Sequence, residues 1–368
     1  MSAREKQWDE YYRLLDENGR PLEGVTIPSL TDDEFVEMYY RMRQVRRFDE
    51  RGISLQRQGR MGTFSTVRGH EGALIGSEFA LNDDDWIVPY YRDHAATISH
   101  GIDMSNILMY YMGNEQGNKV APDVNIFPIC ITIGGHVPHA TGLSWASKLK
   151  GESKVFLCYF GDGATSEGDF HEGLNFAGVF DTPTIFFCLN NQWAISTPLE
   201  KQTASQTIAQ KATAYGFEGV RVDGTDPLAV YEVTRNAVER ARNADTDDRR
   251  PTLVEALLYR IAAHNTSDDP TVYRDEEEVE QWKKLDPISR FETFLRDTGR
   301  LNDEIVNAIE TNIEDQVETA VEIAESIEPT PEEIFDYVFE SQPNALSKQQ
   351  SNLMKLHDEY GDDLINDI

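Results

Sequence analysis

Two short polar motifs follow apolar runs that have the length of buried strands. The sequence GDG at residues 161–163 follows the run VFLCYF (155–160), and the asparagine pair 190–191 follows the run TIFFCL (184–189). In open parallel sheets ligands bind at the carboxyl ends of the strands, so we expect the two motifs to meet there. Glycines let backbone amides approach a phosphate, whereas Asp162 would repel it unless a hard cation lay between them. A carboxylate, an amide oxygen and phosphate oxygens are ligands that suit Mg²⁺, so the pair predicts a magnesium–phosphate site.

A dinucleotide-binding fingerprint is the competing interpretation of the same glycines. The spacing Gly161-x-Gly163-x-x-Ser166 nearly matches that fingerprint, and Asp181 lies where its ribose-binding acid would be expected. The third position of the fingerprint is a serine here, and the asparagine pair has no role in that scheme. A nicotinamide-binding site is therefore disfavoured.

The elements that must position these motifs alternate along the chain. From about residue 62 to residue 263, short apolar runs alternate with helical patterns, which is typical of an α/β fold whose parallel sheet is flanked by crossover helices. Residues 252–259 are a further predicted strand. Thr165 and Ser166 are expected to cap the helix that follows the GDG motif, and Asp226 to cap a helix that begins at Pro227.

Helical extensions are predicted on both sides of this region. Thr31 is expected to cap a helix that continues to about residue 51, and residues 302–327 have the apolar spacing of an amphipathic helix that packs on the domain or faces another subunit. Residues 264–274 are polar and are predicted to form a mobile loop. We therefore divide the chain into an N-terminal arm and helix (1–60), a cofactor-binding α/β domain (61–290) and a C-terminal helical extension (291–368).

The composition excludes some classes of partner. The chain has 368 residues with 34 Lys+Arg against 65 Asp+Glu, a formal charge of −31. Nucleic acids and anionic membrane surfaces both require a positive protein surface, so neither is an expected partner. The charge is compatible with an ordinary acidic cytoplasmic protein. Adaptation to molar salt, where the Debye length is about 3 Å and self-repulsion is screened, is the sharper hypothesis.

Cysteines and apolar stretches bear on the cellular location. The cysteines are Cys130, Cys158 and Cys188, and the last two lie within apolar runs, so buried free thiols are expected. Residues 1–10 are charged and lack the apolar centre of a signal peptide. The stretch 124–147 has no charged residue, but its prolines and glycines argue against a membrane span. We expect a soluble cytoplasmic protein.

A family resemblance rests on the long stretch GDGATSEGDFHEGLNFAGVFDTPTIFFCLNNQWAISTP. This stretch is similar to the diphosphate-binding motif of thiamine-dependent enzymes, and more narrowly to the alpha subunit of the decarboxylating component of 2-oxoacid dehydrogenase complexes. Supporting segments are SLQRQGRMGTFS, GHEG, VPYYRD, ITIGGHVPHATG, RVDGTDPLAVY and HNTSDDPTVYR. The resemblance covers about residues 31–342, and it implies a thiamine-diphosphate-binding fold.

The resemblance also implies residue roles. Mg²⁺ would be held by Asp162, by the side chain of Asn191 and by the backbone carbonyl of Trp193. The diphosphate would contact the side chains of Tyr91 and Arg92 and the backbone amides of Gly163 and Ala164. The aminopyrimidine would meet the backbone of Ile131 and Gly135, and Ile133 would keep the cofactor bent, so that its amino group lies near the thiazolium carbon that must lose a proton. His264 would belong to a loop that closes over the cofactor and would assist acyl transfer to a lipoyl group.

Other positions near the motifs suggest smaller roles or departures from the family pattern. His70, His94 and His136 are expected near the mouth of the site, whereas His100, His139, His171 and His357 are expected to be structural. Asn265 stands where mitochondrial members carry a regulatory serine. Leu189 replaces an arginine of branched-chain members, so phosphate neutralisation would depend more on Arg92. Tyr90 is larger than its counterparts and could shape the substrate pocket.

The expected activity is decarboxylation of a 2-oxo acid, with thiamine diphosphate and Mg²⁺ as cofactors and transfer of the acyl group to a lipoylated acyltransferase. Pyruvate is the first choice of substrate, branched-chain 2-oxo acids are the second, and an acetoin-cleaving relative is the third. No residue in the motifs is placed to supply the carboxylate that the aminopyrimidine requires, and in the family a beta subunit supplies it. The resemblance therefore implies an alpha₂beta₂ assembly. A non-catalytic assembly subunit is the alternative from another class, against which the intact Asp162, Asn191, Arg92 and His264 speak.

Overall fold

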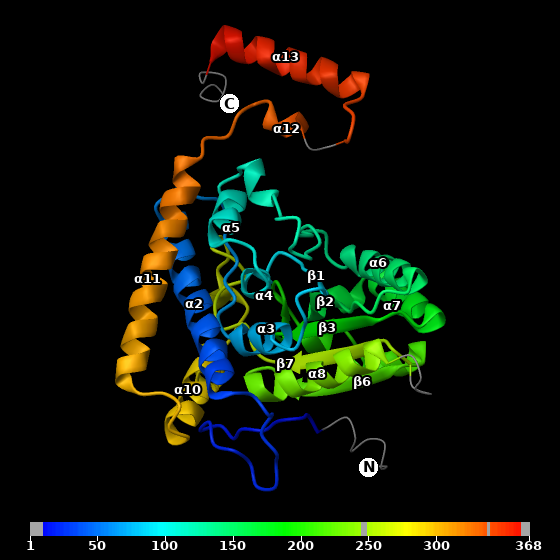
Figure 1. Ribbon diagram of the computed structural model, residues 1–368, viewed down its shortest axis with the longest axis vertical. Coiled ribbons are helices and arrows are strands. Elements are labelled where there is room, and N and C mark those ends of the chain that lie inside the picture. Colours follow the sequence, from blue (N-terminus) through cyan, green and yellow to red (C-terminus); the bar gives the residue numbers. More distant parts are fainter. Residues whose placement is uncertain (1–9, 244–248, 337–338, 362–368) are drawn as a thin grey trace.

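A five-stranded parallel sheet lies at the centre of the computed structural model, which describes residues 10–243, 249–336 and 339–361 (Figure 1). The strand order is β1-β2-β3-β7-β6, and every neighbouring pair is parallel. The strands are β1 (Trp86–Val88), β2 (Phe156–Gly161), β3 (Thr184–Asn190), β6 (Glu218–Asp223) and β7 (Thr252–Leu257). The predicted α/β fold with a parallel sheet flanked by helices is confirmed.

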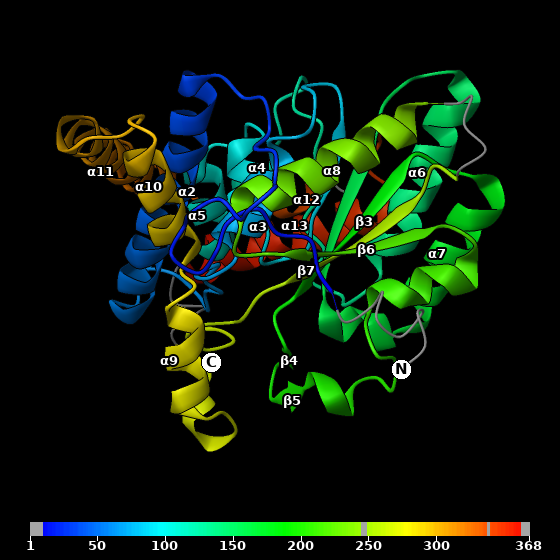
Figure 2. The same cartoon turned by 90° about the horizontal axis from the view of Figure 1, so that it is seen from below.

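Helices cover both faces of this sheet. Along β2, Leu157 and Tyr159 point into one core cluster, whereas Cys158 and Phe160 point into the other. The first cluster packs the sheet against α3 (Glu71–Glu78) and α8 (Pro227–Arg242), and the second packs it against α6 (His136–Lys150) and α7 (Gly168–Phe180), as Figure 2 shows from below. Because both faces are covered, β2 and β3 need no polar alternation, which explains their uninterrupted apolar runs.

The predicted strands agree with the structure to within two residues at each end. Runs 155–160 and 184–189 correspond to β2 and β3, and run 252–259 corresponds to β7, which ends at Leu257. Cys158 and Cys188 are fully buried and free, as expected. In the described ranges no helix is both long enough and apolar enough to cross a membrane.

The predicted helix starts at Thr31 and Asp226 are confirmed. Thr31 caps α2 (Asp32–Arg57) in a reciprocal capping box with Glu34, and the Asp226 carboxylate accepts from the amides of Leu228 and Ala229 at the start of α8.

The expected cap at Thr165 and Ser166 is wrong. Both residues lie inside a 3₁₀ helix, η2 (Asp162–Ser166), and α7 begins at Gly168 without a side-chain cap. The Thr165 hydroxyl is buried and makes no hydrogen bond. The sequence pattern could not reveal that the chain tightens into a 3₁₀ turn directly after β2, which moves the start of α7 past both hydroxyls.

The amphipathic pattern of residues 302–327 corresponds to α11 (Asp303–Ser326), whose apolar side is covered by its own chain. Ile309, Ile313 and Val317 are buried against α2 and α5 (Met104–Tyr111). Arginines of α2 pair with glutamates of α11 along this contact, with Arg43–Glu310 at 2.7 Å and Arg51–Glu318 at 2.8 Å. Of the two predicted partners for this apolar face, the domain itself and another subunit, the structure shows the domain.

The C-terminal part of the chain extends away from the sheet (Figure 1). It contains α12 (Glu333–Asp336) and α13 (Asn344–Tyr360), and no residue of α13 is buried. The remaining elements are α4 (His94–Ser99), η1 (Glu115–Asn118), β4 (Trp193–Ala194), β5 (Thr197–Pro198), η3 (Leu199–Lys201), η4 (Ala209–Tyr215), η5 (Pro270–Val272), α9 (Glu276–Lys283) and α10 (Pro287–Asp297).

The division at residues 60 and 290 stays a prediction. One core cluster contains residues from all three segments, among them Phe35, Leu157 and Val317. The ends of the outer segments, residues 1–9 and 362–368, lie outside the described residues. The prediction that residues 1–10 are not a signal peptide therefore falls almost entirely outside them.

Candidate active site

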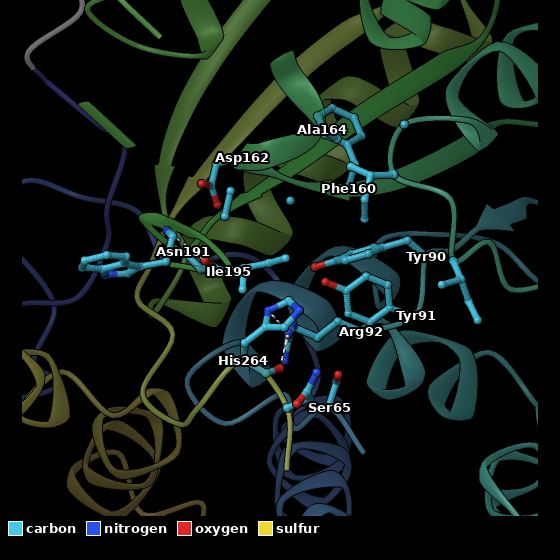
Figure 3. Close-up of a pocket in the computed structure, with 18 of the residues that line it drawn as sticks. Ser65, Tyr90, Tyr91, Arg92, Phe160, Asp162, Ala164, Asn191, Ile195 and His264 are labelled. Carbon is cyan, nitrogen blue, oxygen red and sulfur yellow. Dashed lines mark hydrogen bonds between the residues drawn. The ribbon is translucent and has the colours of Figure 1, made fainter. Parts of the chain in front are cut away.

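A cavity of about 500 Å³ opens at the carboxyl ends of β2 and β3 (Figure 3). All but one of the residues to which the sequence assigned a cofactor, metal or catalytic role line it. These are Tyr91, Arg92, Ile131, Ile133, Asp162, Gly163, Ala164, Asn191, Trp193 and His264. The exception is Gly135, which precedes α6, and the neighbouring Gly134 lines the cavity instead.

Asp162 and Asn191 meet because their strands are neighbours. Gly161 of β2 is in register with Leu189 of β3, so the residues that follow these positions leave the sheet at the same edge. Asp162 is 1% exposed, and burial raises the pKa of its carboxyl to about 6. Gln202 Nε2 donates to it over 2.7 Å. A buried carboxylate that receives only neutral donors favours a cation beside it.

The hairpin of β4 and β5 holds Trp193 next to this pair. Gln192 and Ile195 on either side of β4 have left-handed φ angles of 72° and 55°. Such a φ is a genuine outlier for a β-branched residue, and it is retained only where surrounding contacts impose it. The Ile195 carbonyl accepts from Arg260 Nη2 at 2.7 Å, which is one such contact.

Gly163 is required by the same hairpin. A Cβ atom at this position would lie 2.8 Å from Cβ of Ala194, which is closer than two carbon atoms can approach without a shift. The glycine therefore lets the turn after β2 and the hairpin close around one edge of the cavity.

Two buried arginines face each other across His264. Arg92 and Arg260 are each 1% exposed. Arg92 donates from Nη1 to the Thr66 carbonyl at 2.8 Å and from Nη2 to the His264 carbonyl at 2.7 Å. Within the described ranges no carboxylate forms an ion pair with either guanidinium. Buried guanidinium groups that lack a counter-ion make this end of the cavity a site for an anion.

The protonation of His264 follows from this arrangement. Its Nδ1 lies 3.3 Å from Arg92 Nη2 and 3.4 Å from Arg260 Nη1. Guanidinium groups only donate, so Nδ1 accepts, and the neutral ring carries its hydrogen on Nε2. Burial and the two arginines lower the pKa of His264 to about 4, so the ring is neutral near pH 7. His264 can therefore act as a hydrogen-bond donor through Nε2.

The loop that follows His264 makes several hydrogen bonds in the structure, and its mobility stays a prediction. The Asp268 carboxylate accepts from the amide of His264 at 2.7 Å and from the hydroxyl of Tyr273 at 2.5 Å. Thr266 and Phe64 exchange two bonds, from the Thr266 amide to the Phe64 carbonyl at 2.9 Å and from the Phe64 amide to the Thr266 hydroxyl at 3.0 Å. These bonds join the loop to the segment between α2 and α3.

Aromatic and aliphatic side chains form the opposite wall. The rings of Tyr90 and Tyr91 lie 4.9 Å apart, and Tyr90 stacks on His136 at 6.4 Å (Figure 3 shows both tyrosine hydroxyls directed into the cavity). Ile131 and Ile133 also line the cavity, and they remain 64% and 42% exposed. Large aliphatic side chains exposed beside a cavity are typical of a surface that another protein or a ligand covers.

The histidines near the motifs have different positions. His136 lines the cavity, whereas His70 lies behind Asn191 and contacts its amide. His94 does not reach the cavity, because its Nε2 is paired with the buried Asp49 at 2.7 Å.

Several residues in or beside the cavity had no role predicted from the sequence. Arg260, which contacts the lining residue His264, was missed although it is a lone charge after the apolar strand β7 and lies four residues before that histidine. The lining residues without an assigned role are Thr63, Ser65, Tyr110, Tyr111, Gly134, Phe160, Glu167, Ala194, Ile195 and Asn265. Thr63, Ser65 and Asn265 lie within the quoted motifs, but nothing in those strings indicates which side chains point inward.

The protein side chains alone do not form a complete metal site. Among the described residues no group of three or more His, Cys, Asp or Glu side chains could hold a metal ion. Asp162 and Asn191 offer one carboxylate and one amide, both hard oxygen donors. A cation here would depend on oxygens from a ligand, which agrees with the adjoining anion site.

Comparisons with known proteins identify relatives over most of the chain. A family model described as "Dehydrogenase E1 component" matches residues 39–332. A protein of Staphylococcus aureus (strain Mu50) named pyruvate dehydrogenase E1 component subunit alpha is 39% identical over 342 residues, which cover 92% of this chain and 91% of the relative. A protein of the same name from Bacillus cereus has the same identity and coverage. Another from Bacillus subtilis (strain 168) is 42% identical over 294 residues, 80% of this chain and 78% of the relative.

The family match spans every strand of the sheet and every residue that lines the cavity. The fold expected from the sequence motifs and the family match therefore agree. This chain belongs to the dehydrogenase E1 component family.

Proposed function

We propose that the chain is the alpha subunit of a 2-oxoacid dehydrogenase that decarboxylates pyruvate and passes the acetyl group to a lipoylated acyltransferase. The observation that carries the proposal is the single cavity that brings Asp162, Asn191, Arg92 and His264 together. The names of the relatives favour pyruvate over branched-chain 2-oxo acids and acetoin.

The cavity residues fit thiamine diphosphate with Mg²⁺. Asp162, Asn191 and the Trp193 carbonyl would hold the cation. Arg92 would pair with the diphosphate beside Tyr91 and the backbone amides of Gly163 and Ala164. Leu189 stands where branched-chain members have an arginine, and the buried guanidinium of Arg260, which lies beside His264, would add positive charge at this end of the site. When bound, thiamine diphosphate supplies a carbon nucleophile for the carbonyl of a 2-oxo acid and accepts the electrons left by departing CO₂.

The remaining residues would orient the reactants. Ile133 would support the bent cofactor, and Ile131 would pack beside it. His264 would donate from Nε2–H to an oxygen or sulfur of the reacting acyl and lipoyl groups, because its Nδ1 is occupied by two guanidinium groups. Tyr90, stacked on His136, would limit the size of the substrate side chain.

A beta subunit is the expected partner, in an alpha₂beta₂ assembly. Asp162 and Glu167 are the only acids among the lining residues that the structure describes, and Asp162 is assigned to the cation. A second subunit would supply the carboxylate for the aminopyrimidine and would cover Ile131, Ile133 and Ile195, which are all exposed. The high net charge favours a cytoplasm rich in salt as the setting.

Reconstitution tests this proposal. The purified chain, given thiamine diphosphate and Mg²⁺, should not decarboxylate 2-oxo acids, and activity should arise when the beta subunit of the same organism is added. Steady-state assays of the pair on pyruvate, acetoin and three branched-chain 2-oxo acids should give the highest kcat/KM for pyruvate. Turnover by the isolated chain would contradict the shared site, and a branched-chain preference would contradict the assigned substrate.

A further inference from the structure

The amide of Asn191 has a defined orientation at the edge of the cavity. Its Nδ2 lies 3.2 Å from Nε2 of His70, and its Oδ1 accepts from the Trp193 amide at 3.2 Å. The two ends of an asparagine amide differ in chemistry, since only the oxygen can bind a cation. A flip of this amide would present an NH₂ group where the proposed metal site needs an oxygen.

The tautomer of His70 fixes which end of the amide faces it. Nδ1 of His70 lies 3.4 Å from the Arg68 carbonyl, which can only accept, so Nδ1 carries the hydrogen. Nε2 is then an acceptor, and only the NH₂ end of Asn191 can face it. The ring is completely buried.

The segment that carries His70 is itself held firmly. The Glu71 carboxylate accepts from the Gly69 amide at 2.7 Å and from Arg46 Nε at 2.5 Å. Gly69 has a φ of 91°, and a Cβ atom there would lie 2.8 Å from the Tyr259 carbonyl oxygen. The imidazole therefore has a fixed position behind the strand end that carries Asn191.

We propose that His70 is a positioning residue that holds the Asn191 amide with Oδ1 directed toward the cation. The proposal rests on the magnesium site of the proposed function, and it adds a residue that touches neither the cation nor the substrate. Partners of this kind orient metal ligands, and their loss typically weakens metal binding about 10- to 100-fold.

Calorimetric titration of the assembled alpha and beta subunits with MgCl₂, at a fixed excess of thiamine diphosphate, tests the proposal. His70→Leu removes the acceptor and should weaken Mg²⁺ binding about tenfold or more. His70→Gln offers an acceptor oxygen and should restore most of the affinity. His100→Leu is the matched control, because the His100 side chain is also buried but pairs with Glu78 instead. This control should bind Mg²⁺ like wild type.

A double-mutant cycle separates positioning from a general structural effect. In an Asn191→Ala background, His70→Leu should cause no further loss of Mg²⁺ affinity, because the amide it would orient is absent. If the His70→Leu chain does not assemble with the beta subunit, His70→Phe replaces it in the experiment, because the phenylalanine ring has no hydrogen-bond acceptor. Wild-type Mg²⁺ affinity in His70→Leu or His70→Phe, or an equal loss of affinity in the Asn191→Ala background, would overturn the inference. A wild-type assembly that binds no Mg²⁺ would instead overturn the proposed function.

Discussion

The carbonyl oxygen and the ring nitrogen Nδ1 of His264 both face the same guanidinium nitrogen, Nη2 of Arg92, at 2.7 and 3.3 Å (Figure 3). Arg92 thus fixes both the backbone and the ring of His264. The residue proposed to bind the diphosphate is also the one that orients the residue proposed to assist acyl transfer. Binding of the anion and orientation of the histidine are therefore coupled through one side chain.

The first prediction concerns His264. His264→Ala should leave folding and cofactor affinity near wild type but slow acetyl transfer to a lipoyl domain by about 10²–10⁴-fold, the usual range for loss of a positioned proton donor. Single-turnover transfer with a lipoyl domain would measure this, and calorimetry with thiamine diphosphate would serve as the control. Equal single-turnover rates for variant and wild type would rule out the role.

The second prediction concerns Arg260 and pH. Desolvation is the largest cause of the lowered pKa of His264, and Arg92 and Arg260 lower it further. Arg260→Gln removes one positive charge beside Nδ1, so the pKa of His264 should rise from about 4 toward its ordinary value. The acidic limb of the pH profile for acyl transfer should then move to higher pH, because the ring must be neutral to keep its present hydrogen bonds.

The control for Arg260→Gln is Tyr273→Phe, a substitution beside Arg260 that does not alter any charge. Tyr273→Phe removes one hydrogen bond that Arg260 donates and one that Asp268 accepts, without removing the charge of either residue. The acidic limb should therefore stay near its wild-type position in Tyr273→Phe. An unshifted limb in Arg260→Gln would mean that the charge of Arg260 does not act on His264.

The third prediction concerns metal-dependent binding at Asp162. Asp162→Ala should abolish Mg²⁺-dependent binding of thiamine diphosphate by the assembled subunits, since the remaining protein ligands are neutral. The variant should still fold, because Asp162 lies at the end of β2 and not within either core cluster. Calorimetry measures the loss, and unchanged affinity would remove Asp162 from the site.

The fourth prediction concerns stability without metal. Burial raises the pKa of Asp162 from 3.8 to about 6, so the folded chain binds more protons than the unfolded chain between these pH values. Stability is then lost as pH rises through about 6, by up to about 3 kcal/mol at pH 7. Asp162→Asn should therefore raise the free energy of unfolding of the metal-free chain by about 1–3 kcal/mol at pH 7.

The same comparison at low pH provides the control. At about pH 3 or below, under the ordinary pKa of 3.8, the wild-type carboxyl is largely protonated in both states, so the advantage of Asp162→Asn should largely disappear. Urea denaturation at pH 7 and at about pH 3 gives both values. Equal stability of the two proteins at pH 7 would show that burial of this carboxylate carries no such cost.

The fifth prediction concerns salt. With a net charge of −31, self-repulsion should destabilise the chain in dilute buffer, and molar KCl should raise its melting temperature and restore activity. Screening also weakens ion pairs such as Arg43–Glu310, but pairs of this kind contribute only about 0–1 kcal/mol each. The reduction of repulsion should therefore dominate.

Sucrose distinguishes charge screening by KCl from the stabilisation that any solute excluded from the protein surface produces. It favours the folded state without screening charge, so it should restore stability less than molar KCl does. Identical melting curves and full activity in dilute and molar KCl would contradict adaptation to salt.

The sequence by itself determined the elements whose causes are local. The apolar runs before GDG and before the asparagine pair became β2 and β3, because an uninterrupted apolar run of six residues can be satisfied only by burial on both faces. Thr31 and Asp226 capped their helices because a cap depends on residues two and three positions away. The motifs likewise indicated nearly all the cavity residues that were assigned a role.

Only the tertiary structure decided which distant groups share an environment. Arg260 and Arg92 come from different elements, and their joint effect on His264 exists only because the chain returns to the same edge of the sheet. His70 reaches Asn191 across 121 positions of sequence, and α11 covers its apolar face with α2. Hydrogen-bond direction, burial and charge act through space, so no local pattern could have specified these contacts.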